Sequence, residues 1–185
     1  MIIQKKDFYS IEIALKALKQ EKIVILPTDT IYGFSGIFPN TSNKIANIKG
    51  RDLNKPFIAL VSSIDDILKY SSSVIPSKIL NLLPAPITLI LNLKDGSTQA
   101  FRYPKDVWLT NLISSLKTPI FSTSVNYSGS PAITSIIEII KEFEDKVELI
   151  VSDGDLENKA STIIDLTNET PKILRLGDLK LDNIL

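Results

Sequence analysis

Residues 26–36 read LPTDTIYGFSG, and they follow directly on the apolar residues 23–26. The apolar run predicts a buried strand over residues 22–26 that ends at Pro27, where hydroxyl and carboxylate side chains take over. In α/β proteins, ligands bind beyond the carboxyl ends of strands, so this change of character predicts the rim of a small-molecule pocket. Taken alone, the same residues are also those of an Asx or Ser/Thr turn that leaves a strand.

On both sides of this stretch the chain alternates between predicted helices and strands. Apolar residues at helical spacing predict helices behind Ser10, near 45–49, after Ser63, after Pro76, over 108–116 and over 134–143. We expect Ser10 to be an N-cap, and residues 63–66 resemble a capping box that would begin at Ser63. Strands are expected at 57–61, 87–93, 99–103, 119–122, 148–152, 161–166 and 172–176, with 87–93 and 99–103 forming an antiparallel pair. The pattern predicts an α/β fold with a twisted, mixed β-sheet flanked by helices, in one domain that spans residues 1–185.

Composition narrows the chemistry. The chain has 21 basic and 21 acidic side chains among 185 residues, and it contains no cysteine and no histidine. The zero net charge argues against a protein that grips nucleic acid through a large uniform field. Thiolate and histidine catalysis and the commonest zinc ligands are excluded, so catalysis would depend on positioning and on charge stabilisation. Without a membrane-length apolar run or a signal-peptide core, we expect a cytoplasmic protein with no membrane partner.

Hydroxyl and cationic side chains recur at the predicted strand ends. Residues 122–129, STSVNYSG, follow a short apolar strand and carry more hydrogen-bonding groups than a plain turn needs. Lys49 and Arg51 follow a short helix, where cations often only face solvent and favour the helix dipole. Arg102 stands in an apolar strand, where an edge-strand arginine with a buried stem is the alternative. Because the chain has neither GxxxxGK[ST] nor GxGxxG, phosphates would be met by side chains. Together these features imply a cleft for an anionic ligand with five cations: Lys49, Arg51, Lys55, Arg102 and Arg175.

The order of these motifs resembles the YrdC-domain family, and in particular its single-domain threonylcarbamoyl-adenylate synthases (TsaC/YrdC type). The matching motifs are PTDTIYGF, KGRDLNKP, LPAPITLIL, FRYP, STSVNYSGSPA, STIID and RLG. The resemblance implies a YrdC-like sheet with a concave, positively charged face. It also implies a nucleotidyltransferase that makes threonylcarbamoyl-adenylate and pyrophosphate from L-threonine, bicarbonate or CO2, and ATP. That product serves the t6A modification of adenosine 37 in tRNA.

The resemblance also implies roles for individual residues and partners. Catalysis would depend on the KxR and SxN elements, which are Lys49, Arg51, Ser124 and Asn126. The expected ATP contacts are Arg51, Lys55, Thr98, Ser124, Ala132 and Arg175. The expected threonine-binding residues are Thr28, Tyr32, Arg102, Ser122 and Ser161. Mg2+ would be bound mainly through the ATP phosphates, with no protein metal site. The implied partners are separate transferase proteins (TsaD/TsaB/TsaE type), with tRNA or double-stranded RNA as an RNA partner.

Two positions depart from the family pattern, and two alternatives remain open. Leu60 stands where some relatives have a histidine near the threonine pocket, and Ala85 replaces a glycine in the LPAP motif. One alternative function is a non-catalytic RNA- or nucleotide-binding module on the same fold. The other, a carbamoyl-transfer domain of the hydrogenase-maturation type, is disfavoured by the lack of zinc-binding cysteines.

Overall fold

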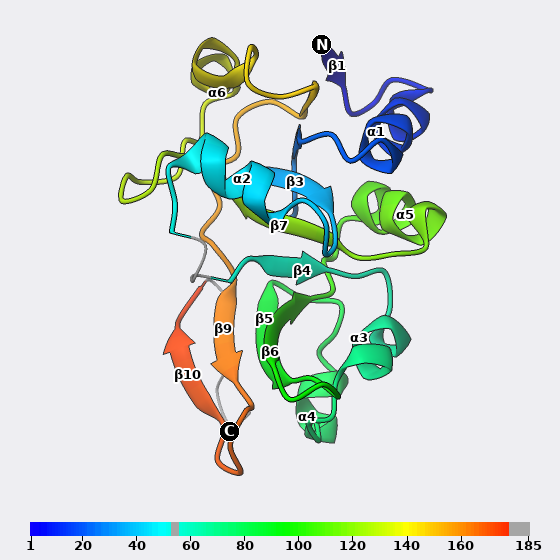
Figure 1. Cartoon of the computed structure of the whole chain (residues 1–185), viewed down its shortest axis with the longest axis vertical. Helices are drawn as coiled ribbons and strands as arrows, with labels where there is room; N and C mark the ends of the chain where they lie inside the picture. The colour runs from blue at the N-terminus through cyan, green and yellow to red at the C-terminus, as the bar shows by residue number, and fades with distance from the viewer. Residues whose placement is uncertain (53–55, 178–185) are drawn as a thin grey trace.

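A single mixed sheet runs through the computed structural model, which describes residues 1–52 and 56–177. Its ten strands lie in the order β1-β8-β2-β3-β7-β4-β6-β5-β9-β10. The sheet is strongly twisted: in Figure 1, β3, β7 and β4 lie roughly horizontally, whereas β5, β6, β9 and β10 lie roughly vertically. Four neighbouring pairs are parallel (β1 with β8, β8 with β2, β4 with β6, β5 with β9), and the other five are antiparallel. The mixed, twisted sheet predicted from the sequence is confirmed.

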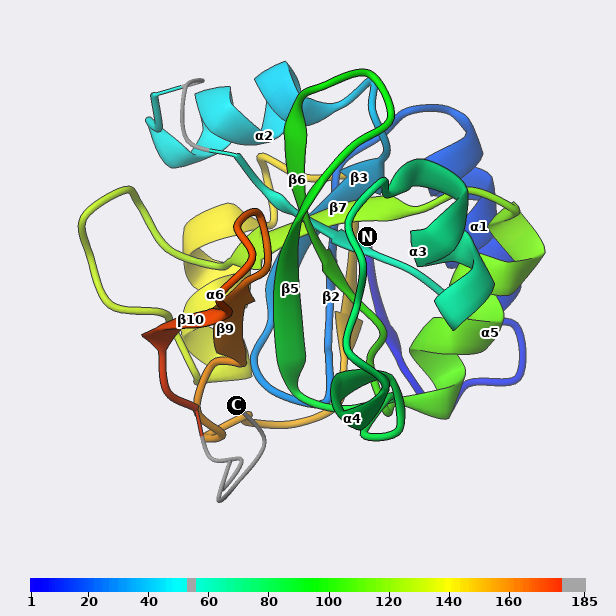
Figure 2. The same ribbon diagram turned by 90° about the horizontal axis from the view of Figure 1, so that it is seen from below.

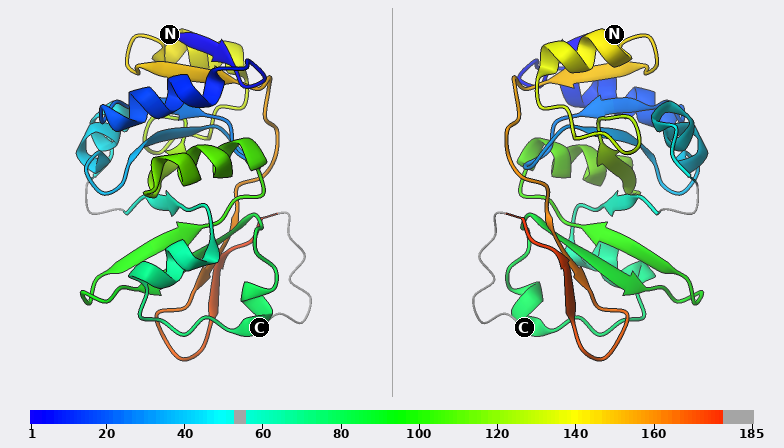
Figure 3. Two further views of the ribbon diagram at one scale, coloured as in Figure 1. Left: turned by 90° about the vertical axis from the view of Figure 1, so that its right-hand side faces the viewer. Right: turned by 90° about the vertical axis from the view of Figure 1, so that its left-hand side faces the viewer.

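Helices cover both faces of one half of the sheet, which contains β1 (Ile2–Gln4), β8 (Leu149–Ser152), β2 (Val24–Leu26), β3 (Gly33–Ile37) and β7 (Ile120–Ser124). On one face, α1 (Ser10–Lys19) and α5 (Val107–Leu116) pack against Val24 and Leu26. On the other face, α2 (Ser42–Lys49) and α6 (Ile136–Phe143) pack against Ile25. Figure 3 shows α1 and α5 side by side on this half. Alternate residues of β2 thus point into two different cores, so the strand is apolar throughout.

Helices cover only one face of the other half, which contains β4 (Ile58–Leu60), β6 (Thr98–Arg102), β5 (Ile87–Asn92), β9 (Thr162–Asp165) and β10 (Lys172–Arg175). There α3 (Ile64–Tyr70) and α4 (Ser77–Leu80) pack through Ile67 and Ile79 onto β5 and β6. Figure 2 shows this half from below, with β5 and β6 beside β9 and β10. In the described part of the chain no helix covers the opposite face, and the cavity described below lies there.

Most predicted elements form close to their expected positions. The antiparallel pairing of 87–93 with 99–103 is confirmed by β5 and β6, which pair Leu89 with Phe101. Ser63 caps α3 as expected, because its hydroxyl accepts a hydrogen bond from the Asp66 amide at 3.1 Å. The substitution at Ala85 is accommodated: the residue is buried, has no positive φ, and donates from its amide to the Tyr103 carbonyl at 3.1 Å.

Two strands and one cap differ from the expectation. The sequence did not predict β1 or β3, because β1 is only three residues long and β3 begins with a glycine and contains another, both of which weaken a strand pattern. Gly33 is required by packing, since a Cβ there would lie 2.3 Å from the Ser122 Oγ. Ser10 is not the N-cap of α1; Tyr9 occupies that position, and the Ser10 hydroxyl donates to the Lys5 carbonyl.

Among the described residues, no helix combines the length and the apolar character that are needed to cross a membrane.

Candidate functional site

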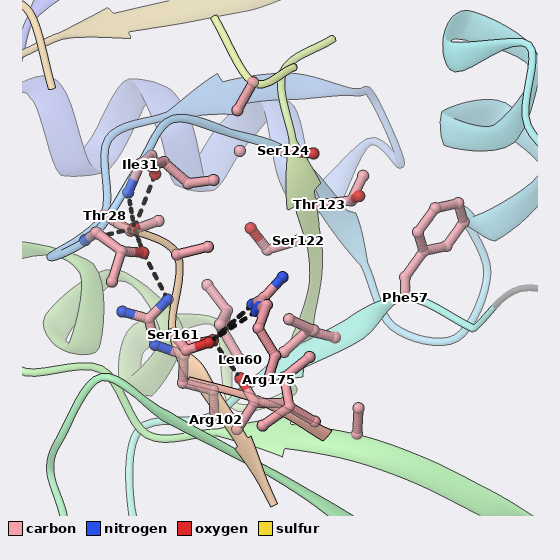
Figure 4. Close-up of a pocket in the computed structure, with 18 of the residues that line it drawn as sticks. Thr28, Ile31, Phe57, Leu60, Arg102, Ser122, Thr123, Ser124, Ser161 and Arg175 are labelled. Atoms are coloured by element: carbon pink, nitrogen blue, oxygen red, sulfur yellow. Dashed lines mark hydrogen bonds between the residues drawn. The ribbon is translucent and has the colours of Figure 1, made fainter. Parts of the chain in front are cut away.

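A cavity of about 450 Å³ lies on the uncovered face of the sheet (Figure 4). Five strands contribute alternate residues to its lining, as expected when one face of each strand is exposed to it: Ile58 and Leu60, Thr88 and Ile90, Ala100 and Arg102, Ser122 and Ser124, Ser161 and Ile163 (Ser161 directly precedes β9). The volume is typical of a small-molecule site. The cavity therefore lies on the face of the sheet, whereas the sequence predicted a rim beyond the ends of its strands.

The segment between β2 and β3, residues 28–32, forms what we call the turn wall. Its Thr28 hydroxyl accepts from the amides of Thr30 and Ile31 at 3.0 and 3.2 Å and donates to the Ile31 carbonyl at 2.8 Å. The Tyr32 ring is fully buried, and its hydroxyl donates to the Gly154 carbonyl at 2.7 Å and accepts from the Asp153 amide at 2.8 Å. Burial raises the pKa of Tyr32. The stretch is thus both a Ser/Thr turn and a cavity wall.

Arg102 at the end of β6 packs against the turn wall. Its guanidinium donates to the Thr30 hydroxyl at 2.8 Å and forms an ion pair with Asp29. The Arg102 side chain is only 5% exposed. Burial lowers its pKa, the nearby Asp29 carboxylate opposes that shift, and Arg175 adds to it. Arg102 is therefore a buried cation inside the sheet, which excludes the edge-strand alternative, since β6 lies between β4 and β5.

Residues 124–132 form a second, neighbouring side of the cavity, which we call the loop wall. Lys49, at the end of α2, lies behind it and is almost fully buried. Its ammonium group donates to the Ser124 carbonyl, to the Asn126 carbonyl at 2.9 Å and to the Asn126 Oδ1 at 2.6 Å. The same Oδ1 accepts from the Ser124 hydroxyl at 2.7 Å. Burial, reinforced by the charge of Arg51, lowers the pKa of Lys49 to about 8.

Arg51 and Phe57 line the cavity next to the loop wall. The Arg51 guanidinium lies 4.9 Å from the centroid of the Phe57 ring, and it donates to the Pro56 carbonyl at 3.2 Å and to the Thr123 hydroxyl at 3.5 Å. Burial lowers its pKa. A cation–π contact of this kind holds the guanidinium over the ring and leaves some of its donors free, an arrangement that suits a phosphate or a carboxylate.

A third arginine approaches from β10. Arg175 donates through two nitrogens to the Ser161 carbonyl at 3.0 and 2.8 Å, and the Ser161 hydroxyl is 2.7 Å from that of Thr88. Burial lowers the pKa of Arg175. This contact joins β10 to the start of β9 at the floor of the cavity.

The cavity favours anions. Three arginines and no carboxylates are present among the described residues that line it. The described part of the chain has two buried side-chain nitrogens without a hydrogen-bond partner, and both are the Nε atoms of cavity arginines, Arg51 and Arg102. Because buried donors are almost always paired in folded proteins, these atoms indicate where a ligand would supply acceptors.

The cavity brings together most of the residues that the sequence singled out: Thr28, Tyr32, Arg51, Arg102, Ser122, Ser124, Asn126, Ala132, Ser161 and Arg175. Lys49 is not in the lining, and its hydrogen bonds hold the loop wall from behind. Thr98 is exposed and outside the lining. It is the first residue of β6, on the same face as Arg102 but about 13 Å from it along the strand. Lys55 lies outside the described residues. Leu60, the departure noted above, contributes an apolar side chain to the lining.

Sequence reasoning missed several lining residues. Thr30 and Thr88 are buried hydroxyls bound to site residues, and Phe57 stacks on Arg51. Thr30 stands in the PTDTIYGF motif, so the motif could have indicated it. Thr88 lies in an apolar strand, where only the alternation of the strand between a core face and a cavity face would have revealed it.

Comparisons with known proteins agree with this geometry. A family model for Sua5, YciO and YrdC proteins, described as telomere recombination, matches residues 16–177. The threonylcarbamoyl-AMP synthase of Pyrococcus abyssi is 31% identical over 98% of this chain and 58% of its own length. A crystal structure of P. abyssi Sua5 complexed with L-threonine superposes with a TM-score of 0.89 at 30% identity, covering 100% of this chain and 59% of that one. E. coli YciO matches in fold, with a TM-score of 0.86 at 24% identity over 100% of this chain and 97% of that one.

The fold and the arginine-lined cavity define an α/β protein with a site for small anionic ligands. The chain belongs to the Sua5/YciO/YrdC family. It spans a little more than half the length of the P. abyssi relatives that it matches.

Proposed function

We propose that this chain is a threonylcarbamoyl-AMP synthase, which makes threonylcarbamoyl-adenylate and pyrophosphate from L-threonine, bicarbonate or CO2, and ATP. The observation that carries the proposal is the cavity itself, with three arginines and no carboxylate in its described lining. Two comparisons add support: a P. abyssi relative bears this name, and P. abyssi Sua5 was crystallised with L-threonine. Such a cavity accommodates the reaction, because a carboxylate must approach a polyphosphate and the two repel each other.

The proposed division of the cavity follows from burial. The turn wall offers a deep, rigid guanidinium at Arg102 with hydroxyls around it, which suits the small carboxylate of threonine. The loop wall offers Arg51 stacked on Phe57 beside hydroxyl and amide groups, which suits the phosphates of ATP. Following the family resemblance, we assign Thr28, Tyr32, Arg102, Ser122 and Ser161 to the amino acid and Arg51, Ser124, Ala132 and Arg175 to the nucleotide.

The reaction needs little acid–base chemistry from the protein. The threonine amino group and bicarbonate give a carbamate and water. A carbamate oxygen then forms a bond to the α-phosphorus, while the bond from that phosphorus to the bridging oxygen breaks and its electron pair leaves with pyrophosphate. Positioning and charge neutralisation are the main requirements for phosphoryl chemistry of this kind, and a chain without histidine can supply both.

The donor set fits a Mg2+ ion that enters with the nucleotide. No cluster of three or more metal-ligating side chains occurs in the described ranges 1–52 and 56–177, and the cavity lining offers hydroxyl and amide oxygens. Mg2+ keeps several waters and usually binds through substrate phosphates, where it neutralises charge. The chain's own contribution is to orient those phosphates through Arg51, with Ser124 nearby in the lining.

The proposal is tested with purified protein, ATP, Mg2+, bicarbonate and L-threonine. Pyrophosphate release that depends on threonine, together with the adenylate product detected by mass spectrometry, is the expected result. The Arg51→Ala variant should lose about 100-fold in turnover, because it removes charge stabilisation next to the phosphates. Absence of threonine-dependent pyrophosphate would refute the synthase, and an unchanged rate in Arg51→Ala would remove that residue from its role.

The same preparation addresses the alternative of an RNA-binding module. Binding of tRNA or double-stranded RNA that weakens steeply with salt, without any threonine-dependent turnover, would favour the module. In the proposed role the protein works in the cytoplasm, and its product passes to separate t6A transferase proteins that act on tRNA.

A further inference from the structure

Asp29 belongs to the turn wall and to the PTDTIYGF motif, but the family resemblance gave it no role. Its side chain bridges two distant segments of the chain. One carboxylate oxygen forms the ion pair with Arg102, and the other accepts a hydrogen bond from the Lys105 amide at 3.0 Å. The Asp29 side chain is 13% exposed. It does not line the cavity, so it would act on a ligand through Arg102 or through its charge rather than by direct contact.

The guanidinium of Arg102 is held on two of its nitrogens. One terminal nitrogen donates to the Thr30 hydroxyl at 2.8 Å, and the other donates to Asp29. A guanidinium has five N–H donors in a planar fork, so two contacts on different nitrogens fix both its position and its plane. Its Nε has no partner among the described residues, and each terminal nitrogen carries a second hydrogen besides the one it donates.

We infer that Asp29 is a positioning residue for substrate binding: it holds one side of the Arg102 guanidinium so that the other donors are directed at the carboxylate of the amino-acid substrate. The inference rests on the proposed function, which supplies that carboxylate. Asp29 thereby links the β2–β3 turn to the end of β6, two elements from different halves of the sheet that must be in register for the carboxylate to be bound.

Charge alone would have the opposite effect, because removing a carboxylate near the cavity favours anion binding. Two substitutions separate the effects. Asp29→Asn and Asp29→Ala both remove the charge, but only asparagine keeps an oxygen that can accept from Arg102. The ratio of the two variants therefore measures positioning, whatever the loss of charge contributes.

The experiment measures L-threonine and ATP binding separately by calorimetry for the wild type and both variants. We expect Asp29→Ala to bind threonine about tenfold more weakly than Asp29→Asn, the usual effect of losing one charge-assisted hydrogen bond, with ATP affinity within about twofold. The matched control is Asp66→Ala, which removes a half-buried carboxylate that accepts from the Ser62 amide and hydroxyl and is not part of the cavity lining. It should leave both affinities unchanged.

Equal threonine affinities in the two variants, or a parallel loss of ATP binding in Asp29→Ala, would overturn the inference. A second readout does not depend on the proposed function. Nitrogen-15 NMR of the Arg102 guanidinium should show faster rotation of its NH2 groups in Asp29→Ala than in Asp29→Asn or the wild type, and equal rotation would also overturn it. If wild-type protein binds no threonine, the proposed function fails, while the NMR comparison still decides whether Asp29 positions Arg102.

Discussion

The two walls of the cavity each depend on one buried cation, and the two cations are stabilised in different ways. At the turn wall, Arg102 is paired with a carboxylate, Asp29, and with the Thr30 hydroxyl. At the loop wall, Lys49 is surrounded by uncharged oxygens of Ser124 and Asn126. Burial lowers the pKa of Lys49 to about 8, whereas an arginine remains charged throughout the physiological range.

The comparison shows that similar polar segments use a cation for different purposes. Arg102 lines the cavity and keeps unpaired donors, so it is available to a ligand. Lys49 donates its three ammonium hydrogens to three protein oxygens. It thereby holds the loop wall, whose residues Ser124 and Asn126 line the cavity. We therefore expect the turn wall to be insensitive to pH and the loop wall to be sensitive to it.

The largest expected effect is at Arg102. Arg102→Met should lower kcat/KM for threonine by about 1000-fold. It removes the cation that would bind the threonine carboxylate, and it leaves the nearly buried Asp29 carboxylate without its ion-pair partner. Arg102→Lys keeps the charge but cannot contact Thr30 and Asp29 with a fork, and it should retain about tenfold more activity than Met. Steady-state kinetics at varied threonine checks this. If Met and Lys behaved alike with less than a threefold loss, Arg102 would not be the anion-binding group of the turn wall.

The next effect is a pH dependence of stability from the loop wall. The pKa of Lys49 is lowered to about 8 from 10.5, so between these values the unfolded chain binds more protons than the folded one. By linkage, this group's contribution to stability rises with pH across that window, and it is at its lowest, and constant, below about pH 8, where both states are protonated. The gain amounts to about 3 kcal/mol at most.

Urea unfolding of the wild type and Lys49→Met at pH 8 and pH 10 measures this contribution. The difference in unfolding free energy should move in favour of the wild type at the higher pH. Lys49→Arg, which stays charged, serves as the control and should show no such slope. A difference that is constant with pH would mean that the Lys49 ammonium is not disfavoured by burial.

A smaller effect is expected where the two walls meet. Gly33 pairs with Ser124 across β3 and β7, and a Cβ there would lie 2.3 Å from the Ser122 Oγ. Gly33→Ala should force the Ser122 hydroxyl into another rotamer, at a cost of about 1 kcal/mol in stability. Thermal unfolding and threonine affinity are the measurements, and Ser122→Ala should suppress the stability loss by removing the clashing atom. A loss that persists in the double variant would point to a backbone conflict.

The smallest effect is expected at Thr98, beyond the cavity along β6. Its exposure and its distance from Arg102 leave room only for a contact with an extended ligand such as a nucleotide. Thr98→Ala should raise KM for ATP by no more than about threefold, as expected for one exposed hydrogen bond. Thr110→Ala, a helix residue whose hydroxyl donates to the Val107 carbonyl, is the matched control. A tenfold change at Thr98 would extend the loop-wall subsite to the start of β6.

The local pattern determined most secondary structure, because hydrophobic periodicity reports directly on which residues are buried. It predicted β5 with β6 and the helix capped by Ser63, since turn and capping chemistry depend on neighbouring residues. It failed for β3, whose glycines are explained only by contacts with Ser122 and Thr41, side chains from elsewhere in the chain.

The sequence by itself also determined the chemical inventory: the hydroxyls, the arginines, and the absence of histidine and cysteine. Only the tertiary structure decided how that inventory is used. It placed the site on the uncovered face of the sheet, put Lys49 behind the loop wall, and brought Asp29 to Arg102. The physical reason is that residue types and spacings fix which bonds a side chain can make. The twist of the sheet and the pairing of distant strands decide which partners are within reach.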